Sequence, residues 1–287
     1  QEDRITGSPT RYRFGVLRSI LSHRGDKDRA VKIPRMRDQL VLRALLKELQ
    51  KHLENERIPH TTPCVPACLK NIIRGRQDGF LNVMHADITA FFDCIDHDIL
   101  LNKLRAFCSD SKCTDLTARL LKTPCRDTFS LDPQDIVPEK GIPQGCSVSG
   151  MLGELYLADL DKALTKHDDL IYIRYADDIL LMAKDFDTLD AGKQCLQKEL
   201  EKMKLELNKN KTNDTSFEAG FYFLGFHFTG DKMLRKEKKV ERFFLHLKNI
   251  LKEELGKEAD ADAFNRAIRR MNREISPTKT PVSEGSR

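Results

Sequence analysis

Two short apolar runs, residues 170–174 and 179–183, are separated by the polar tetrapeptide Tyr175-Ala176-Asp177-Asp178. Apolar runs of this length on either side of a tight polar turn predict a β-hairpin. The turn would place two adjacent carboxylates at the exposed edge of a sheet, where their like charges repel. A bound divalent cation would relieve that repulsion, whereas a turn that simply favours Asp needs no cation. The hairpin thus constrains the fold and leaves both explanations of its carboxylates open.

A third carboxylate, on Asp87, ends another apolar run, residues 81–88, which is typical of a buried strand. If this strand neighbours the hairpin, Asp87 lies beside Asp177 and three carboxylates converge. Such a group can hold two Mg²⁺ ions that activate a 3′-hydroxyl and stabilise a leaving pyrophosphate. Three nearby acids could compete for this role, but their spacing is typical of a helix start: Asp93, Asp96 and Asp98.

Hydrophobic periodicity predicts helices and strands that alternate through the centre of the chain. Helical patterns cover residues 38–53, 98–107, 148–164 and 189–205, and a second hairpin is expected at 221–228. Residues 58–80, with three Pro and two Gly, are expected to be loop-rich with a short helix. The central order of strand, helix, hairpin, helix and strand predicts an α+β fold with a ferredoxin-like antiparallel sheet against helices. That platform does not specify a function by itself.

Charge is distributed unevenly along the chain. Residues 1–84 carry 17 Lys and Arg against 9 Asp and Glu, residues 85–230 carry 17 against 25, and residues 231–287 carry 15 against 10. Two basic flanks around an acidic centre suit a chain that grips a phosphate backbone and holds metal ions, although solvated helix faces would give the same totals. No apolar run approaches the roughly 18 residues that span a bilayer, and no signal-peptide pattern is visible. We therefore expect a cytoplasmic protein without a membrane partner.

The eight cysteines include no CxxC pair, and without an export signal we expect them to be free thiols. A zinc site from four of them would need unusual spacings without His support: Cys64, Cys68, Cys108 and Cys113. The chain begins with Gln1 rather than Met, which suggests a trimmed chain or a piece of a longer polypeptide with a fused domain.

Six segments together resemble the motifs of reverse transcriptases. Asp87-Ile88-x-x-Phe91-Phe92-Asp93-x-Ile95-x-His97 resembles the first catalytic motif of bacterial and group II intron reverse transcriptases, and Tyr175-Ala176-Asp177-Asp178 resembles the third. The remaining four stand in the family's order: Arg29-x-x-x-Ile33-Pro34-x-x-x-Asp38 in the fingers, Gly141-Ile142-Pro143-Gln144-Gly145, Leu207-Asn208-x-x-Lys211-Thr212, and Phe223-Leu224-Gly225-Phe226 in the primer-grip hairpin. The chain resembles this family over about residues 25 to 230.

The resemblance implies a right-hand polymerase fold. Fingers would occupy residues 1–84, and a ferredoxin-like palm residues 85–230 with a finger insertion at about 108–140. A short helical thumb, partial or compact, would occupy 231–275, and residues 276–287 would form a disordered tail.

The resemblance also assigns roles to individual residues. Asp87 and Asp177 would be the main metal ligands, with Asp178 and the Ile88 carbonyl as further ligands; the ions would be two Mg²⁺, with Mn²⁺ as an alternative. Lys211 would donate a proton to the leaving pyrophosphate, although an ordinary solvated Lys would give the same pattern. The remaining roles fall to Arg29 with Arg24 or Lys27 at the incoming triphosphate, Gln144 and Gly145 in the nucleotide pocket, and Phe223, Leu224 and Gly225 in the primer grip.

Phe92 lies five residues after Asp87, where the family places an aromatic ring beside the 2′ position of the nucleotide. A bulky ring there excludes a ribose hydroxyl and favours deoxynucleotides. One of Phe91 and Phe92 could equally be an ordinary core residue. The resemblance thus implies an RNA-directed DNA polymerase that uses an RNA template, dNTPs and a DNA, RNA or protein primer.

Two features of the sequence indicate which group of reverse transcriptases the chain resembles most. Residues 146–152 depart from the Ser-Pro-containing stretch usual in group II intron enzymes, and no space is left for a maturase, endonuclease or RNase H domain. This favours a domesticated bacterial enzyme of the antiviral-defence or CRISPR-linked groups. Template-independent or protein-primed DNA synthesis, and a non-catalytic RNA-binding scaffold, are the alternative functions.

Overall fold

The computed structural model describes residues 12–24, 27–55, 64–127 and 134–235, which form two compact units that divide between Ala219 and Gly220. Each unit is described by itself. The predicted helices after residue 235 and the tail at 276–287 lie outside the described residues, as do residues 128–133 of the predicted finger insertion.

A four-stranded antiparallel sheet forms the centre of the first unit, in the order β6-β7-β3-β8. Its strands are β3 (Asn82–Asp87), β6 (Leu170–Tyr175), β7 (Asp178–Ala183) and β8 (Asn213–Ser216). β7 is buried along nearly its whole length, which explains why its sequence is continuously apolar rather than alternating. The sheet confirms the predicted α+β class.

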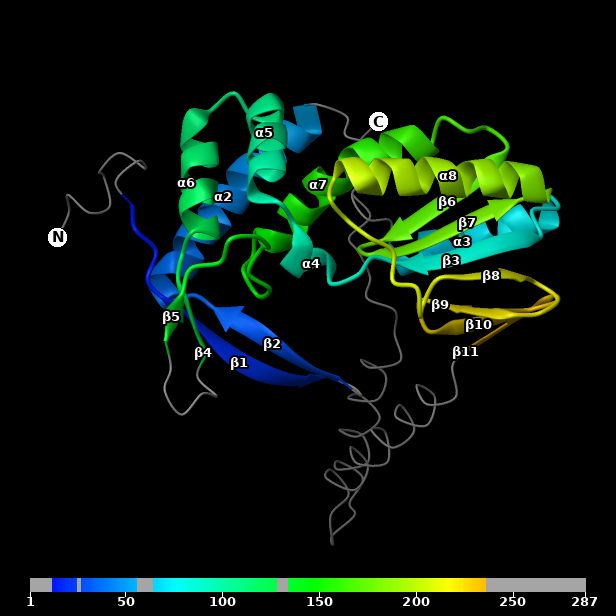
Figure 1. The fold of residues 1–287 in the computed structure, drawn as a ribbon, viewed down its shortest axis with the longest axis horizontal. Helices are drawn as coiled ribbons and strands as arrows, with labels where there is room; N and C mark the ends of the chain where they lie inside the picture. Colours follow the sequence, from blue (N-terminus) through cyan, green and yellow to red (C-terminus); the bar gives the residue numbers. More distant parts are fainter. Residues whose placement is uncertain (1–11, 25–26, 56–63, 128–133, 236–287) are drawn as a thin grey trace, which may run out of the picture. The chain divides into compact units, whose positions relative to one another are not determined.

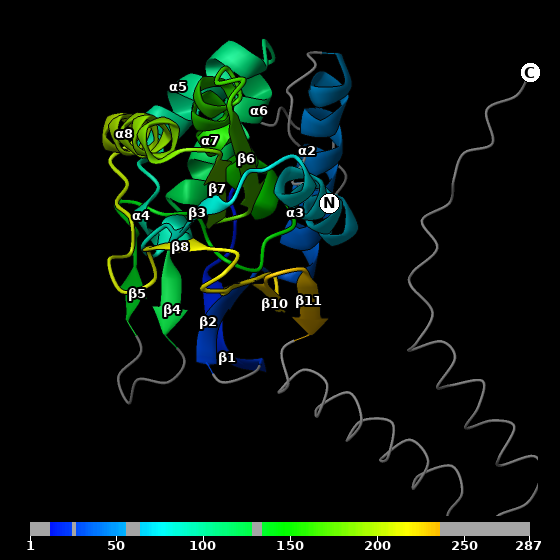
Figure 2. The same ribbon diagram turned by 90° about the vertical axis from the view of Figure 1, so that its right-hand side faces the viewer.

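Helices cover both faces of this sheet, as Figures 1 and 2 show. α8 (Phe186–Lys202) lies over one face, packs on α7 (Ser149–Leu164), and places Gly192 against Leu170. α3 (Val65–Gln77) lies on the other face, where Gly75 meets Ile171 and Met182. Two glycines therefore let helices approach the sheet closely from opposite sides.

The short helix expected within residues 58–80 is confirmed as α3, although the described part of this range is mostly helix rather than loop. α3 fills 13 of these residues, because Pro66 stands in the first helical turn, where its missing N–H costs nothing. The other predicted helices are confirmed with shifted ends, as α2 (Met36–Asn55) and α5 (His97–Phe107). α4 (Phe91–Cys94) and α6 (Ser111–Leu121) have no counterpart in the periodicity analysis.

A second sheet of the first unit has the order β2-β1-β4-β5. β1 (Leu17–Arg24) and β2 (Lys27–Ile33) form a hairpin, and β1 also pairs in parallel with β4 (Cys125–Asp127), whose other neighbour is β5 (Asp135–Ile136). The chain before β1 is fixed by the fully buried Asp38, which accepts hydrogen bonds from the Tyr12 hydroxyl at 2.6 Å and the Gly15 amide at 3.0 Å.

The described part of the second unit is a three-stranded antiparallel sheet in the order β11-β10-β9. Its strands are β9 (Phe221–Phe223), β10 (Phe226–Thr229) and β11 (Lys232–Arg235). The second predicted hairpin, at residues 221–228, is thereby confirmed. Residues 232–235, assigned to a helical thumb by resemblance, form a strand because they pair with β10.

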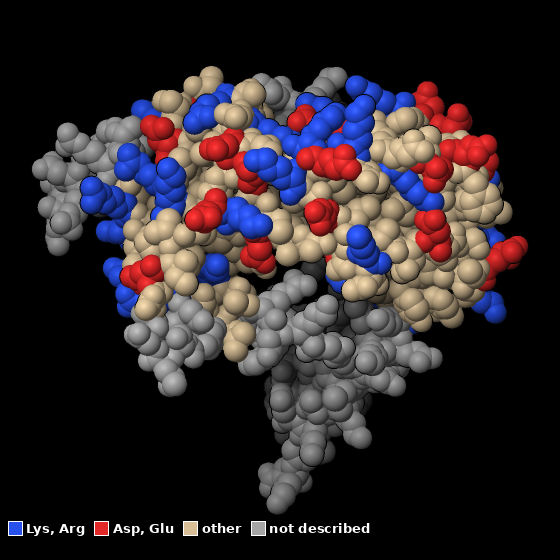
Figure 3. Space-filling view, in the orientation of Figure 1, with Lys and Arg blue, Asp and Glu red and all other residues tan. Residues whose placement is uncertain are grey.

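The charges on one face of the molecule and the cysteines of the described residues bear on two expectations from the sequence. Lys and Arg are interspersed with Asp and Glu on the face in Figure 3, which is typical of a solvated surface. All eight cysteines are free, and no three His, Cys, Asp or Glu side chains of the described residues are grouped to hold a metal ion, so the zinc site is not formed there. No helix among the described residues is long and apolar enough to cross a bilayer.

Candidate active site

The tetrapeptide Tyr175-Ala176-Asp177-Asp178 forms the predicted turn between β6 and β7. Tyr175 pairs with Asp178 across the hairpin, which leaves Ala176 and Asp177 as a two-residue turn. Ala176 has a φ of 55°, a left-handed conformation that costs a residue with a side chain roughly 1–2 kcal/mol. The surrounding contacts must offset this strain for the turn to persist.

Asp87 ends the strand next to β7, as predicted. It pairs with Asp178 in the antiparallel register, and the Ile88 amide donates to the Asp177 carbonyl over 3.2 Å. Asp87 is buried, with 7% of its surface exposed. The register therefore brings the end of β3 and the hairpin turn together, so that the three predicted carboxylates share one end of the sheet.

Lys211 contacts Asp87 directly, with 2.6 Å between the Lys211 Nζ and the Asp87 Oδ2. The loop that carries it is tied to the end of β3, because the Asn208 amide donates to the Asp87 carbonyl over 2.8 Å. The Lys211 amide in turn bonds to the Asn208 carbonyl. A buried carboxylate thus has an ammonium partner from a distant part of the sequence.

The pKa of Asp177 is raised above its ordinary value, chiefly because burial disfavours the ionised form. The negative charges of Asp178 and Asp87 raise it further, whereas a backbone hydrogen bond and the Lys211 ammonium lower it. An added cation near Asp177 would stabilise the charged form and reverse this shift. The electrostatics of the turn therefore favour a cation.

The donor set suits Mg²⁺, which takes one or two protein carboxylates and completes its shell with waters and substrate phosphates. Asp87 and Asp177 supply hard oxygen ligands of this kind. Asp178 also lies 3.7 Å from His85, measured from its Oδ1 to the imidazole Nε2. Among the described residues no three His, Cys, Asp or Glu side chains are grouped closely enough to hold a metal ion, so Asp87, Asp177 and Asp178 share the end of the sheet without forming such a group.

The two aromatic rings after Asp87 have different environments. Phe91 is buried at 2% exposure, whereas Phe92 is half-buried. Their ring centroids lie 5.0 Å apart, and both rings pack against Gly153 of α7, where an added Cβ would approach each ring to 3.1–3.3 Å. Phe91 is thus the core residue of the pair, whereas Phe92 packs against the same core and is only partly buried, so its contact with a nucleotide sugar stays a prediction.

The loop around Gln144 and Gly145 lies against β2. The Lys32 amide donates to the Gln144 carbonyl over 2.6 Å. Gly145 has a φ of 110°, and a Cβ there would lie 2.5 Å from the Val31 Cγ1 and 2.8 Å from the Lys32 carbonyl oxygen. The glycine is required by this close approach and by its backbone conformation. The Gln144 amide group is 3.5 Å from the Asp93 Oδ2.

The remaining predicted residues lie on hairpins. Arg24 pairs with Lys27 at the end of the β1–β2 hairpin, and Arg29 pairs with Ser22, so all three cationic positions share this hairpin. Phe223 ends β9 in the second unit, and Leu224 and Gly225 form the turn to β10 with φ values of 50° and 83°. The triphosphate and primer-grip roles of these residues stay predictions.

The acids that could compete with Asp87 have other partners. Asp96 is the N-cap of α5 and accepts hydrogen bonds from the Asp98 and Ile99 amides, each over 3.0 Å. It also pairs with Lys204 at 2.6 Å, and this hydrogen bond is the main reason that its pKa is lowered. The prediction of a helix start at these acids is confirmed.

The sequence analysis missed Arg174, Asp161 and Glu154, which lie behind the turn. Arg174 is 5% exposed and Asp161 2% exposed, and they form a bidentate ion pair. A charged residue inside the apolar run 170–174 was the available signal, since charges are rarely buried unless paired.

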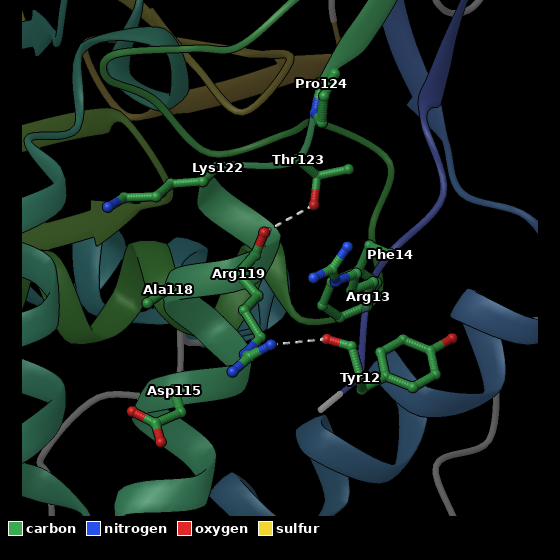
Figure 4. A pocket seen from close by; sticks show the side chains of 9 residues that line it. All are labelled: Tyr12, Arg13, Phe14, Asp115, Ala118, Arg119, Lys122, Thr123 and Pro124. Atoms are coloured by element: carbon green, nitrogen blue, oxygen red, sulfur yellow. Dashed lines mark hydrogen bonds between the residues drawn. The ribbon is translucent and has the colours of Figure 1, made fainter. Parts of the chain in front are cut away.

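A separate cavity of about 510 Å³ lies between the chain before β1 and the end of α6 (Figure 4). Its lining combines Tyr12 and Phe14 with Arg13 and Arg119, and the Arg119 guanidinium donates to the Tyr12 carbonyl over 3.3 Å. None of the three candidate carboxylates lines it.

Comparisons with known proteins agree with the geometry. Solved structures with a similar fold include telomerase from Candida tropicalis in its apo form (TM-score 0.65, 12% identity, covering 91% of this chain and 59% of that chain). They also include telomerase from Candida albicans with a TWJ fragment of telomeric RNA (TM-score 0.63, 14% identity, 94% of this chain and 57% of that chain). At these identities the likeness shows the fold, which is that of a right-hand polymerase.

Among curated proteins, Protein YkfC of Escherichia coli (strain K12) is 24% identical over 247 residues, covering 69% of this chain and 62% of that protein. The chain thus spans less than two thirds of the length of the relatives it matches. A family model described as reverse transcriptase (RNA-dependent DNA polymerase) matches residues 23–228, which contain every predicted site residue. The chain therefore belongs to the reverse transcriptase (RNA-dependent DNA polymerase) family, a family of nucleotidyltransferases.

Proposed function

We propose that this chain is an RNA-directed DNA polymerase that adds dNTPs to a primer 3′-end at the Asp87–Asp177 end of the central sheet. The observation that carries the proposal is the register of β3 against β7, which brings Asp87 beside the Asp177 turn. The pKa of Asp177 is raised chiefly by burial and further by the charges of Asp178 and Asp87, and a cation at this position would offset both effects.

Each side chain of the site has a part in this proposal. Asp87 and Asp177 hold two divalent ions, Mg²⁺ or Mn²⁺, with Asp178 and the Ile88 carbonyl as auxiliary ligands. When bound, such ions activate a primer 3′-hydroxyl and stabilise the leaving pyrophosphate. Lys211 holds a proton at Nζ, 2.6 Å from Asp87, in a position to serve as general acid.

The substrate-binding roles follow the surroundings of the site. Phe92 is half-buried beside fully packed Phe91, which suits a ring that contacts the sugar of an incoming deoxynucleotide. Gln144 and Gly145 line the nucleotide pocket next to β2. Arg24, Lys27 and Arg29 share one hairpin, where guanidinium and ammonium groups would meet the triphosphate.

The partners of the reaction are also proposals. We propose an RNA template, as for the telomerases solved with telomeric RNA, and a DNA, RNA or protein primer held at Phe223, Leu224 and Gly225. A domesticated role such as antiviral defence fits the departure of residues 146–152 from the group II intron pattern.

The test is a primer-extension assay with a defined RNA template, dNTPs and Mg²⁺, which compares the wild type with Asp177→Ala. We expect template-dependent product from the wild type and a loss of at least about 100-fold in the variant, a loss on the scale of other deleted groups that stabilise transition-state charge. Asp168→Ala, which removes an exposed carboxylate after α7, is the matched control and should keep full activity. Product without template would favour template-independent synthesis, and no product under any condition would favour an RNA-binding scaffold.

A further inference from the structure

A buried cluster of charged side chains lies behind the turn that carries Asp177. We name it the Arg174 cluster, and its members are Arg174, Asp161, Glu154 and Tyr172. The Arg174 Nε and Nη2 donate to the two Asp161 oxygens over 2.7 and 2.5 Å, and the Nη2 also donates to the Glu154 Oε2 over 2.7 Å. The Tyr172 hydroxyl donates to the Asp161 Oδ1 over 2.6 Å.

The cluster joins two elements of the first unit. Arg174 and Tyr172 stand on β6, whereas Asp161 and Glu154 stand on α7. Burying such charges carries a desolvation penalty, and well-packed apolar residues in their place are often as stable or more stable. Stability alone therefore does not account for the cluster, and a geometric function is the alternative.

One donor of Arg174 points out of the cluster and into the turn. The Arg174 Nη1 donates to the carbonyl of Ala176 over 3.1 Å. Ala176 is the residue with the left-handed φ of 55°, and the next residue is Asp177. On the far side of the turn the Ile88 amide donates to the Asp177 carbonyl over 3.2 Å. Two successive carbonyls of a strained turn thus each accept a hydrogen bond, one from Arg174 on β6 and the other from Ile88 after β3.

We propose that Arg174 is a positioning residue, whose guanidinium is fixed by Asp161 and Glu154 and holds the Ala176 carbonyl so that Asp177 is presented to the same site as Asp87. The inference rests on the proposed polymerase function, because it explains how that site keeps its geometry. Only Arg meets the requirement, since its planar fork can bond a carboxylate with two donors and reach a third acceptor with another.

The decisive variant is Arg174→Lys, which keeps the charge but loses the fork. We expect faster amide hydrogen–deuterium exchange across residues 174–178 in the protein without nucleic acid, by about 10-fold or more, because the turn opens more often. In primer extension we expect kcat to fall about 10- to 100-fold, since a displacement of about 1 Å can have this effect. The half-saturating Mg²⁺ concentration should rise, while the KM for dNTP stays within about twofold of the wild-type value.

Tyr172→Phe is the matched control, because it removes another hydrogen bond to Asp161 on the same strand and leaves the Arg174 fork in place. Its exchange rates and its Mg²⁺ dependence should equal those of the wild type. If Arg174→Lys does not fold, Glu154→Gln is the second variant, because it neutralises one charged partner of Arg174 at a partly exposed position. Amide exchange at residues 174–178 and the half-saturating Mg²⁺ concentration should then rise, and kcat should fall, by smaller factors than in Arg174→Lys.

The outcomes separate the inference from the proposed function. Unchanged exchange at 174–178 in the folded variant overturns the positioning role, whatever the wild-type enzyme synthesises. Faster exchange with an unchanged Mg²⁺ dependence also overturns it, because the turn would then not set the metal ligand. If the wild type makes no product, the polymerase proposal fails, and the exchange data alone decide whether Arg174 holds the turn.

Discussion

At the scale of single residues, Phe92 offers a sharp test of substrate choice. Phe92→Ala should remove the ring that would contact the sugar, so that the added hydroxyl of a ribonucleotide no longer meets a steric obstacle. Because an apolar pocket rejects an added hydroxyl by at most about 100-fold, we expect discrimination against ribonucleotides to fall by about 10-fold or more. Single-nucleotide incorporation with dNTP and rNTP measures the ratio of their kcat/KM values.

Phe186→Ala is a suitable control for this measurement, because Phe186 is a large exposed ring at the start of α8. It should leave the ratio unchanged. An unaltered ratio in Phe92→Ala would assign Phe92 to packing against Phe91 and Gly153 alone.

Asp96 provides a pH-dependent prediction. Its pKa is lowered by Lys204 and by the amides that it caps, so its stabilising effect is fully present above the pKa of an unfolded Asp. That effect is lost as the pH falls through the lower folded-state value. Asp96→Ala should therefore reduce the free energy of unfolding by about 1 kcal/mol at pH 7, the usual effect of losing an N-cap.

Chemical denaturation of Asp96→Ala and wild type at several pH values checks this prediction. The difference between the two proteins should shrink below the ordinary Asp pKa. Asp98→Ala, which removes an exposed acid from the same first helical turn, should show a smaller effect. If the difference in the free energy of unfolding stays the same at pH values below the ordinary Asp pKa, the ionised carboxylate of Asp96 is not its cause.

Single residues also show how far the sequence could predict the site. The strand that ends at Asp87 and the hairpin turn that carries Asp177 follow from local patterns, because apolar runs that end in acids can be recognised in the sequence alone. The family resemblance implied a role for Lys211 at the leaving pyrophosphate, but its contact with Asp87, 124 positions away, was not predicted. Arg174 and Asp161 were missed because a single charge within an apolar run does not reveal which distant carboxylate pairs with it.

At the scale of elements, the approach of β2 to the Gln144–Gly145 loop depends on a missing side chain. Gly145→Ala would place a Cβ against the Lys32 backbone and force an unfavourable positive φ, which costs roughly 1–2 kcal/mol before any clash. We expect both a lower melting temperature and a higher KM for dNTP, because β2 must move away from the loop. Thermal denaturation and steady-state kinetics measure the two effects.

Gly150→Ala is the matched control, since Gly150 lies in the first turn of α7 with open space around its Cα. An Ala there should stabilise the protein by about 0.4–1 kcal/mol through a less flexible unfolded chain. If Gly145→Ala and Gly150→Ala have the same melting temperature and the same KM for dNTP, the contact of Gly145 with β2 affects neither stability nor nucleotide binding.

Helices and strands were not predicted correctly in two situations. In one, an element forms only through contacts with a distant part of the sequence; in the other, Pro and Gly residues indicate a loop although the segment is helical. α3 was underestimated because its Pro and Gly residues suggested a loop, whereas Pro66 begins the helix and Gly75 permits close packing on Ile171. β4 and β5 are strands of three and two residues, too short to show a hydrophobic periodicity, and they form because β4 pairs with β1 and β5 pairs with β4. Three strands of the central sheet, β3, β6 and β7, were predictable because each has six residues and lies in an apolar run, whereas the short polar β8 was not predicted.

At the scale of the whole molecule, the excess of Lys and Arg in residues 1–84 predicts salt-sensitive binding to nucleic acid. For single-stranded RNA, log K should fall linearly with log salt concentration, with a slope of about −0.7 for each phosphate contacted. Six such contacts would give a slope of about −4. Fluorescence anisotropy with a labelled RNA across a salt series measures it.

A control RNA of the same length with an unrelated sequence should give the same slope, because phosphate contacts carry no sequence information. Binding that is insensitive to salt would show that the basic residues are ordinary solvated side chains. The interspersed charges in Figure 3 are compatible with ordinary solvated side chains. The total charge of residues 1–84 does not distinguish these from residues that bind phosphate, so the salt series is needed.

The parallel pairing of β1 with β4 has a consequence for how the chain is made. Leu17 meets Cys125, so β1 gains this neighbour only after roughly 110 further residues have been synthesised, which takes about 5–20 seconds at common rates of translation. During that interval the nascent chain can form the β1–β2 hairpin, but the opposite edge of β1 stays open, next to the exposed Ile20 and Leu21. An open apolar strand edge is a template for intermolecular pairing. Slow translation or a scarcity of chaperones would therefore affect the yield of this protein through β1, long before the Asp177 turn has left the ribosome.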